Sequence, residues 1–161
     1  MRRKRVLSIG AWCAVSALLL SVAGAVWAAD DGFLGTWKLN EAKSKMAAGL
    51  AKNSTVVYAA DGDKVKVTID GTDDKGQAFH SEWTGKYDGK DYAVTGDPTS
   101  DMRAYKLEGA RTLMATTKKN GKAGVTARIV LSVDGKTRTV TVSATDASGK
   151  KVTATQVYDK Q

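Results

Sequence analysis

Turn-forming residues recur along this chain at short, regular intervals, and they constrain the fold more than any other feature. Asp, Asn or Ser next to Gly accepts the positive φ angles that tight hairpins require. Between the turns, Val, Ile, Thr and aromatic residues alternate with polar residues in the period of two that is typical of strands. The turns fall at Asp61-Gly62, Asp74-Lys75-Gly76, Asp88-Gly89, Asn120-Gly121, Asp134-Gly135 and Ser148-Gly149. This pattern predicts a succession of antiparallel hairpins.

The alternating runs predict about ten strands, and the chain after residue 28 is expected to be a single domain. The strands are expected near residues 35–40, 54–60, 64–72, 77–87, 91–95, 102–108, 111–118, 123–133, 137–146 and 150–159. So long a meander cannot leave one face of an open sheet exposed. We therefore expect an all-β, up-and-down antiparallel β-barrel of about eight to ten strands. A two-sheet sandwich is the alternative.

One stretch favours a helix. Between Glu41 and Ala51, Ala, Met and Leu are good helix formers, and Asn40 could cap the first turn. Met46 and Leu50 would then share one face. The sequence predicts a short helix or helical turn here.

Strand parity predicts which side chains face the interior, because successive residues of a strand point to opposite sides. The predicted inward sets are Val65, Val67 and Ile69; Phe79, Ser81, Trp83 and Tyr87; Val125, Ala127, Ile129, Leu131 and Val133; and Val152, Ala154, Gln156 and Tyr158. His80 falls on the outer side of its strand.

Residues 1–28 have the composition of a secretory signal peptide. A basic start is followed by an apolar run from Val6 to Trp27, and Val26 and Ala28 place small residues before a cleavage site after Ala28. We expect export and a mature protein at residues 29–161, periplasmic or secreted. An uncleaved membrane anchor is the alternative, since about 20 apolar residues can span a bilayer.

Removal of this segment changes the charge and the cysteine content. Four of the 25 basic residues lie in it and all 17 acidic residues lie after it, so the mature net charge is about +4. The lysines form no basic run, which argues against nucleic-acid binding. Cys13 lies early in the apolar run after the bulky Trp12, which does not fit lipoprotein processing. We therefore expect no disulfides and no stable membrane anchor in the mature protein. We also expect a monomer.

Both ends of the mature sequence resemble a known family. The segment Phe33-Leu34-Gly35-Thr36-Trp37-Lys38-Leu39 resembles the first strand of the calycin barrels, which include the lipocalins and the fatty-acid-binding proteins. Residues 155–160 resemble the closing strand of the fatty-acid-binding proteins. More loosely, the chain looks like small exported bacterial proteins described as lipocalin-like.

The resemblance implies roles for four residues. Gly35 and Trp37 would be structural, with Trp37 packed at the closed end of the barrel, while Gln156 and Tyr158 would point into the cavity. Fatty-acid-binding proteins typically carry Arg at the place of Gln156, and that Arg and the Tyr bind the carboxylate of the ligand. A neutral amide cannot replace the charge, so fatty-acid binding is not implied for this chain.

The sequence predicts no catalytic residues, metal site or cofactor, and we do not expect an enzyme. His80 is the only histidine and the mature chain lacks cysteine, so neither a zinc site of several His or Cys ligands nor a buried His-dependent triad is expected.

Two functions remain open. In the first, the barrel carries a small hydrophobic or amphipathic molecule. In the second, its interior is packed, and hairpin tips or a strand edge contact an envelope component as a structural or interaction module. An internal volume of about a few hundred Å³ would favour the carrier. The candidate ligand-binding residues are Phe79, Trp83, Tyr87, Tyr105, Ile129, Gln156 and Tyr158.

Overall fold

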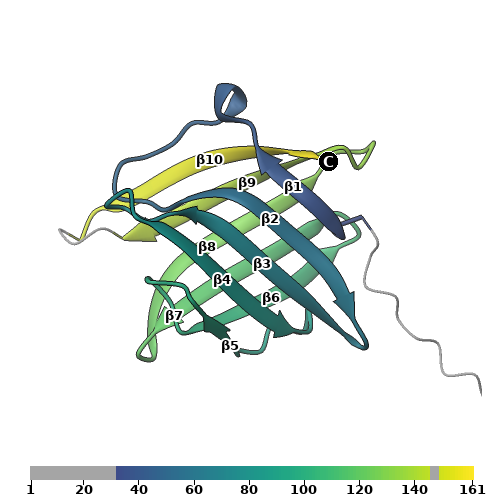
Figure 1. The fold of residues 1–161 in the computed structure, drawn as a ribbon, viewed down its shortest axis with the longest axis horizontal. Coiled ribbons are helices and arrows are strands. Elements are labelled where there is room, and N and C mark those ends of the chain that lie inside the picture. Colours follow the sequence, from purple (N-terminus) through teal and green to yellow (C-terminus); the bar gives the residue numbers. More distant parts are fainter. Residues whose placement is uncertain (1–31, 146–148) are drawn as a thin grey trace, which may run out of the picture.

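The structure, a computed structural model, describes residues 32–145 and 149–161, where ten strands close into one antiparallel barrel (Figure 1). The strands are β1 (Gly35–Leu39), β2 (Lys52–Asp61), β3 (Lys64–Thr72), β4 (Ala78–Gly85), β5 (Tyr92–Thr95), β6 (Met102–Gly109), β7 (Thr112–Lys119), β8 (Lys122–Leu131), β9 (Thr137–Thr145) and β10 (Lys151–Lys160). The predicted up-and-down barrel is confirmed, and the sandwich is excluded. The predicted signal peptide and Cys13 lie outside the described residues.

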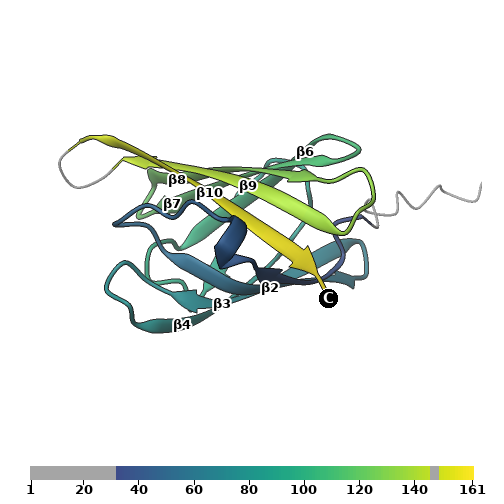
Figure 2. The same cartoon turned by 90° about the horizontal axis from the view of Figure 1, so that it is seen from above.

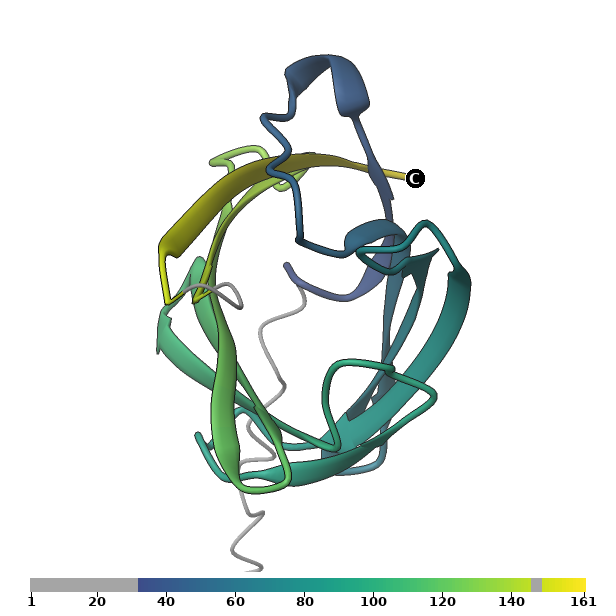
Figure 3. The ribbon, with the colours of Figure 1, turned by 90° about the vertical axis from the view of Figure 1, so that its left-hand side faces the viewer.

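Strand β1 closes the barrel by pairing on both sides. Trp37 lies opposite Val56 of β2 and opposite Lys160 of β10. Figure 3, which looks along the barrel, shows the resulting ring of strands. Closure pairs the edges that an open sheet would leave exposed.

Within residues 32–145, the hairpin turns form where the turn residues predict them. At the β7–β8 turn, Asn120 has a φ of 50° and Gly121 a φ of 75°. Two consecutive positive φ angles are what the tight type I′ hairpin turn requires. Local chemistry therefore sets the point of each reversal, and the reversals set the strand order.

Of the short helix or helical turn predicted over residues 41–51, only a single 3₁₀ turn, η1 (Glu41–Lys43), forms, and no α-helix follows it. Asn40 caps it as expected, since its side chain accepts a hydrogen bond from the Lys43 amide at 3.1 Å. The helix ends because Lys45 exchanges two backbone hydrogen bonds with Thr155 of β10. Pairing with the sheet outweighs helix propensity, and Figure 2 shows η1 beside β10.

Strand parity places the interior correctly, with one exception. Val67 and Tyr158, for example, are buried at inward positions of β3 and β10. Val133, predicted to face inward, is 87% exposed. Strand β8 ends at Leu131, and Ser132 begins the turn to β9 with its amide donating to the Thr137 carbonyl.

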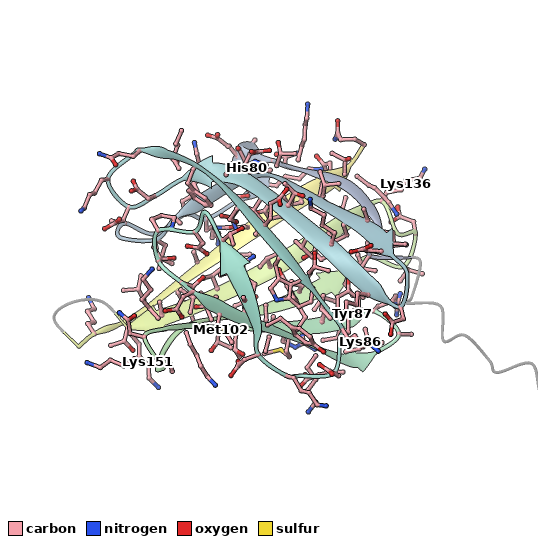
Figure 4. All side chains as sticks on the ribbon, turned by 60° about the horizontal axis from the view of Figure 1, so that its bottom comes forward. His80, Lys86, Tyr87, Met102, Lys136 and Lys151 are labelled. Carbon is pink, nitrogen blue, oxygen red and sulfur yellow. The ribbon has the colours of Figure 1, made fainter. Side chains whose placement is uncertain are left out.

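The two ends of the barrel differ. We call the end with the β3–β4 and β7–β8 turns the rim end, and the end with the β2–β3 and β8–β9 turns the base end. Lys151 lies at the rim end and Lys136 at the base end (Figure 4). The segment between η1 and β2 crosses part of the rim end (Figure 3).

Among the described residues, no helix is long and apolar enough to cross a bilayer.

Candidate ligand-binding cavity

A cavity of about 120 Å³ lies inside the barrel. Its wall is mostly apolar, and β8 and β9 contribute several of its aliphatic residues. Leu50 and Asn53 line it where the chain enters β2, and Thr99 lines it from the β5–β6 loop. The aliphatic wall residues include Val56, Ile69, Ala115, Val125, Ala127, Ile129, Val140 and Val142.

Five of the seven ligand-binding candidates line this cavity, namely Phe79, Tyr105, Ile129, Gln156 and Tyr158. Trp83 and Tyr87 are not among the lining residues; both pack against Tyr105, with ring centroids 4.7 and 6.0 Å from its ring. The Trp83 indole also donates a hydrogen bond to the Arg103 carbonyl at 2.8 Å. These two rings support the wall and do not form its surface.

Gln156 and Tyr158 bind each other. The Tyr158 hydroxyl lies 2.6 Å from Gln156 Oε1 and 3.0 Å from the Asn53 carbonyl, and the Gln156 amide donates to the Ala51 carbonyl at 3.4 Å. Burial raises the pKa of Tyr158, so its hydroxyl stays protonated and remains a donor. This network joins β10 to the start of β2.

Asp97 and Arg103 form a buried ion pair in the cavity wall. Arg103 Nη2 lies 2.7 Å from Asp97 Oδ2, and the two side chains are 6% and 8% exposed. Burial alone would raise the pKa of Asp97, but hydrogen bonds from Ser100 and Thr99, together with Arg103, hold it below its ordinary value. The carboxylate is therefore ionised and neutralises Arg103.

Arg138 of β9 is a second buried guanidinium on the cavity wall. It is 2% exposed, and its central carbon lies 4.5 Å from the Tyr158 ring centroid, 5.0 Å from that of Trp37 and 5.1 Å from that of Tyr58. Neither Nε nor Nη1 has a hydrogen-bond partner in the described protein. None of the ion pairs formed by the described residues includes Arg138.

Sequence reasoning missed Arg138, although a signal for it exists. Arg138 shares strand parity with Val140 and Val142, which also line the cavity. In the same way, Arg103 shares parity with Tyr105 on β6. A charged residue at an inward position of a strand is the pattern that could have identified both Arg103 and Arg138 from the sequence.

Gly35 and Trp37 lie in β1, the first strand of the barrel. Trp37 is fully buried and its indole donates to the Phe33 carbonyl at 2.9 Å. At Gly35, with a φ of 119°, a side chain would also meet the end of the Lys160 side chain, at 2.9 Å. Neither residue is part of the cavity wall.

His80 is exposed on the outer side of β4, as its parity predicts. A hydrogen bond with Asp70 raises its pKa, and the two side chains lie 2.6 Å apart. Within the described ranges, no three His, Cys, Asp or Glu side chains are grouped in a way that could hold a metal ion.

Comparison with known proteins gives little further guidance. No family model matches the chain, and no curated protein matches it. A solved structure described as a redesigned β-barrel, mFAP1, bound to DFHBI has a TM-score of 0.44 and 14% identity. The match covers 82% of this chain and 98% of that one. At this level of similarity, no property of that barrel transfers to this chain.

Proposed function

We propose that this barrel binds a small hydrophobic or amphipathic molecule in its interior, as a monomer, and that its function is binding and not catalysis. The observation that supports the proposal is an internal cavity whose wall is mainly apolar and also carries polar and charged side chains. Ligand sites combine these features, because apolar area supplies affinity and a few polar groups fix orientation.

The cavity limits the size of the ligand. Its 120 Å³ falls short of the few hundred Å³ expected of a carrier, and of the pockets of about 300–1,000 Å³ that hold drug-sized ligands. An apolar cavity of about 150 Å³ is enough for benzene. The proposed ligand is therefore a compound with one small ring or a short chain, or a longer one that enters only in part.

Ala127→Leu tests this function. Ala127 lines the cavity, so the larger side chain is expected to fill it and to weaken binding of benzyl alcohol about tenfold or more. Ala123→Leu, on the exposed part of the same strand, is the matched control. Isothermal titration calorimetry measures both. Equal affinities for the two variants and the parent would show that the ligand binds elsewhere.

One observation favours the alternative function, a structural or interaction module with a packed interior. The cavity is small, and aromatic rings fill the space beside it. Trp83 packs edge-on against Tyr92 and Tyr105. If no small aromatic or aliphatic compound bound in calorimetry, this module would replace the carrier. Recovery of an envelope partner in a pull-down would then support it.

Export is proposed from residues 1–28 alone. A basic start followed by an apolar run and small residues is expected to be cleaved after Ala28. Expression of the full chain in a Gram-negative bacterium should give a periplasmic or secreted protein that begins at Ala29, as N-terminal mass spectrometry would show. An intact Met1 terminus in the membrane fraction would instead indicate an uncleaved anchor.

A further inference from the structure

Tyr58 of β2 and Tyr105 of β6 form a second polar group on the cavity wall, apart from the Gln156–Tyr158 pair. Both tyrosines line the cavity, and both are buried. Their rings meet edge to face with centroids 6.1 Å apart, and the Tyr105 hydroxyl interacts with that of Tyr58. Strands β2 and β6 are not neighbours in the barrel, so the pair meets across the interior.

This tyrosine pair has more hydrogen-bond donors than acceptors around it. Each phenol carries one O–H donor, and a contact between the two uses only one of them. Arg103 lies beside Tyr105, and a guanidinium is a donor only. The carboxylate of Asp97 already accepts hydrogen bonds from Arg103 and Ser100. At least one phenolic O–H is therefore left without an acceptor among the described residues.

The donors that this pair offers to a ligand are uncharged. Burial raises the pKa of Tyr105, so its hydroxyl stays protonated at neutral pH. The charge of Arg103 is balanced by Asp97 at 2.7 Å. The Nε and Nη1 atoms of Arg138 are covered by protein, so they do not reach a ligand in the cavity. The tyrosine pair is therefore suited to a neutral acceptor and not to an anion.

A carbonyl oxygen is the acceptor that fits two neighbouring O–H groups. It has two lone pairs and brings no donor of its own. An alcohol would add another donor to a place where donors are already in excess. Aliphatic side chains such as Val56, Ala115 and Val140 line the same cavity and can contact the apolar part of a ligand.

We propose that the cavity binds a small neutral carbonyl compound such as a ketone, whose oxygen accepts hydrogen bonds from Tyr58 and Tyr105 while the aliphatic wall contacts its apolar body. This inference rests on the proposed binding function and specifies its ligand class. It does not use the Gln156–Tyr158 pair, because the Tyr158 hydroxyl is already held by protein carbonyl groups.

Acetophenone and α-methylstyrene are the test pair, because they have nearly the same shape and only acetophenone carries a carbonyl oxygen. Calorimetry measures the ratio of their affinities in the intact protein and in the double variant Tyr58→Phe/Tyr105→Phe. The double variant keeps both rings and removes both donors. It should lower the preference for acetophenone about tenfold, while α-methylstyrene still binds as to the parent.

Tyr92→Phe is the matched control. It also removes one phenolic hydroxyl, but that hydroxyl donates to Asp88, and Tyr92 does not line the cavity. The affinity ratio should stay at the parent value in this variant. An equal fall in the ratio for Tyr92→Phe would show that loss of any phenol, and not of the cavity pair, changes the ligand preference.

The infrared carbonyl band of bound acetophenone reports the hydrogen bonds directly. A hydrogen bond to a carbonyl oxygen lowers its stretching frequency, and an isotope label on the carbonyl carbon separates this band from the amide bands of the protein. The frequency should be lower in the parent than in an alkane solvent. Tyr58→Phe and Tyr105→Phe should each reverse part of the shift, which a role in packing alone would not do.

Three results would overturn the carbonyl assignment. An unchanged affinity ratio and an unshifted band in the double variant would leave the cavity as a site for apolar compounds only. Tighter binding of benzoate than of acetophenone would assign the cavity to anions. If the parent bound none of these compounds and no other small molecule, the binding function itself would fail.

Discussion

Replacing Asp97 with alanine is expected to lower the free energy of unfolding by about 3–5 kcal/mol, because it leaves Arg103 buried without its counter-charge. The two side chains are 8% and 6% exposed, so solvent cannot take over the role of the carboxylate. The loop loses support as well, since Asp97 Oδ1 accepts the Thr99 amide at 2.8 Å and Asp97 Oδ2 accepts the Ser100 hydroxyl at 2.7 Å. Urea denaturation followed by circular dichroism measures the change.

Asp91→Ala is the matched control for this ion pair. Asp91 also pairs with a basic residue, Lys118, but both side chains are substantially exposed, at 32% and 41%. Its removal should change the stability by no more than about 1 kcal/mol. Similar losses of stability in Asp97→Ala and Asp91→Ala would mean that the Asp97–Arg103 pair is solvated in solution.

The Asp97 pair also predicts how stability depends on pH. Because the folded pKa of Asp97 is lowered, its contribution is present above the ordinary carboxyl pKa of about 4 and is lost as the pH falls through the folded pKa. Asp97→Ala should therefore be less sensitive to acid than the parent in the same denaturation experiment.

Most of the fold could be predicted because its determinants are local. A residue pair such as Asn120-Gly121 fixes a hairpin turn by its own backbone preferences, and period-two alternation fixes which side of a strand is buried. Closure followed from the need to bury a long meander. The turn and alternation signals involve only residues close together in the chain, so they can be recognised in the sequence alone.

The errors arose where a distant contact overrules local preference. Glu41 to Ala51 has helical composition, yet Lys45 pairs with Thr155, which is far away in the sequence. Val133 continues the alternation of its strand, but the hydrogen bonds of the β8–β9 turn end the strand first. Neither contact can be inferred from a window of a few residues.

The candidate site was harder to predict than the fold. Ile129, Gln156 and Tyr158 could be placed on the wall by parity, whereas Trp83 has inward parity but packs against Tyr105 and does not line the cavity. Parity alone places Arg138 inward with Val140 and Val142, whereas the rarity of fully buried charged residues argues against that position. The cavity volume depends on how all these side chains pack together, which no alternation pattern encodes.

Replacing Trp37 with alanine is expected to lower the free energy of unfolding by about 3–5 kcal/mol, because it removes one of the two largest fully buried side chains among the described residues. The change also removes the hydrogen bond to the Phe33 carbonyl and one of the rings stacked on Arg138. Trp37→Phe, which keeps an aromatic ring, should lower the free energy of unfolding distinctly less than Trp37→Ala. Chemical denaturation measures both variants.

A double-mutant cycle between Trp37→Ala and Arg138→Met measures how much of the stability that Trp37 contributes comes from its contact with the buried Arg138 charge. The indole ring lies 5.0 Å from the Arg138 guanidinium carbon, so a desolvated cation–π contact should give a coupling of about 1–2 kcal/mol. With Met at position 138, the loss from Trp37→Ala should therefore be smaller than in the parent. Strictly additive losses would mean that Trp37 stabilises the closed barrel by burial alone. In that case the ring contacts that matter for Arg138 would be those with Tyr58 and Tyr158.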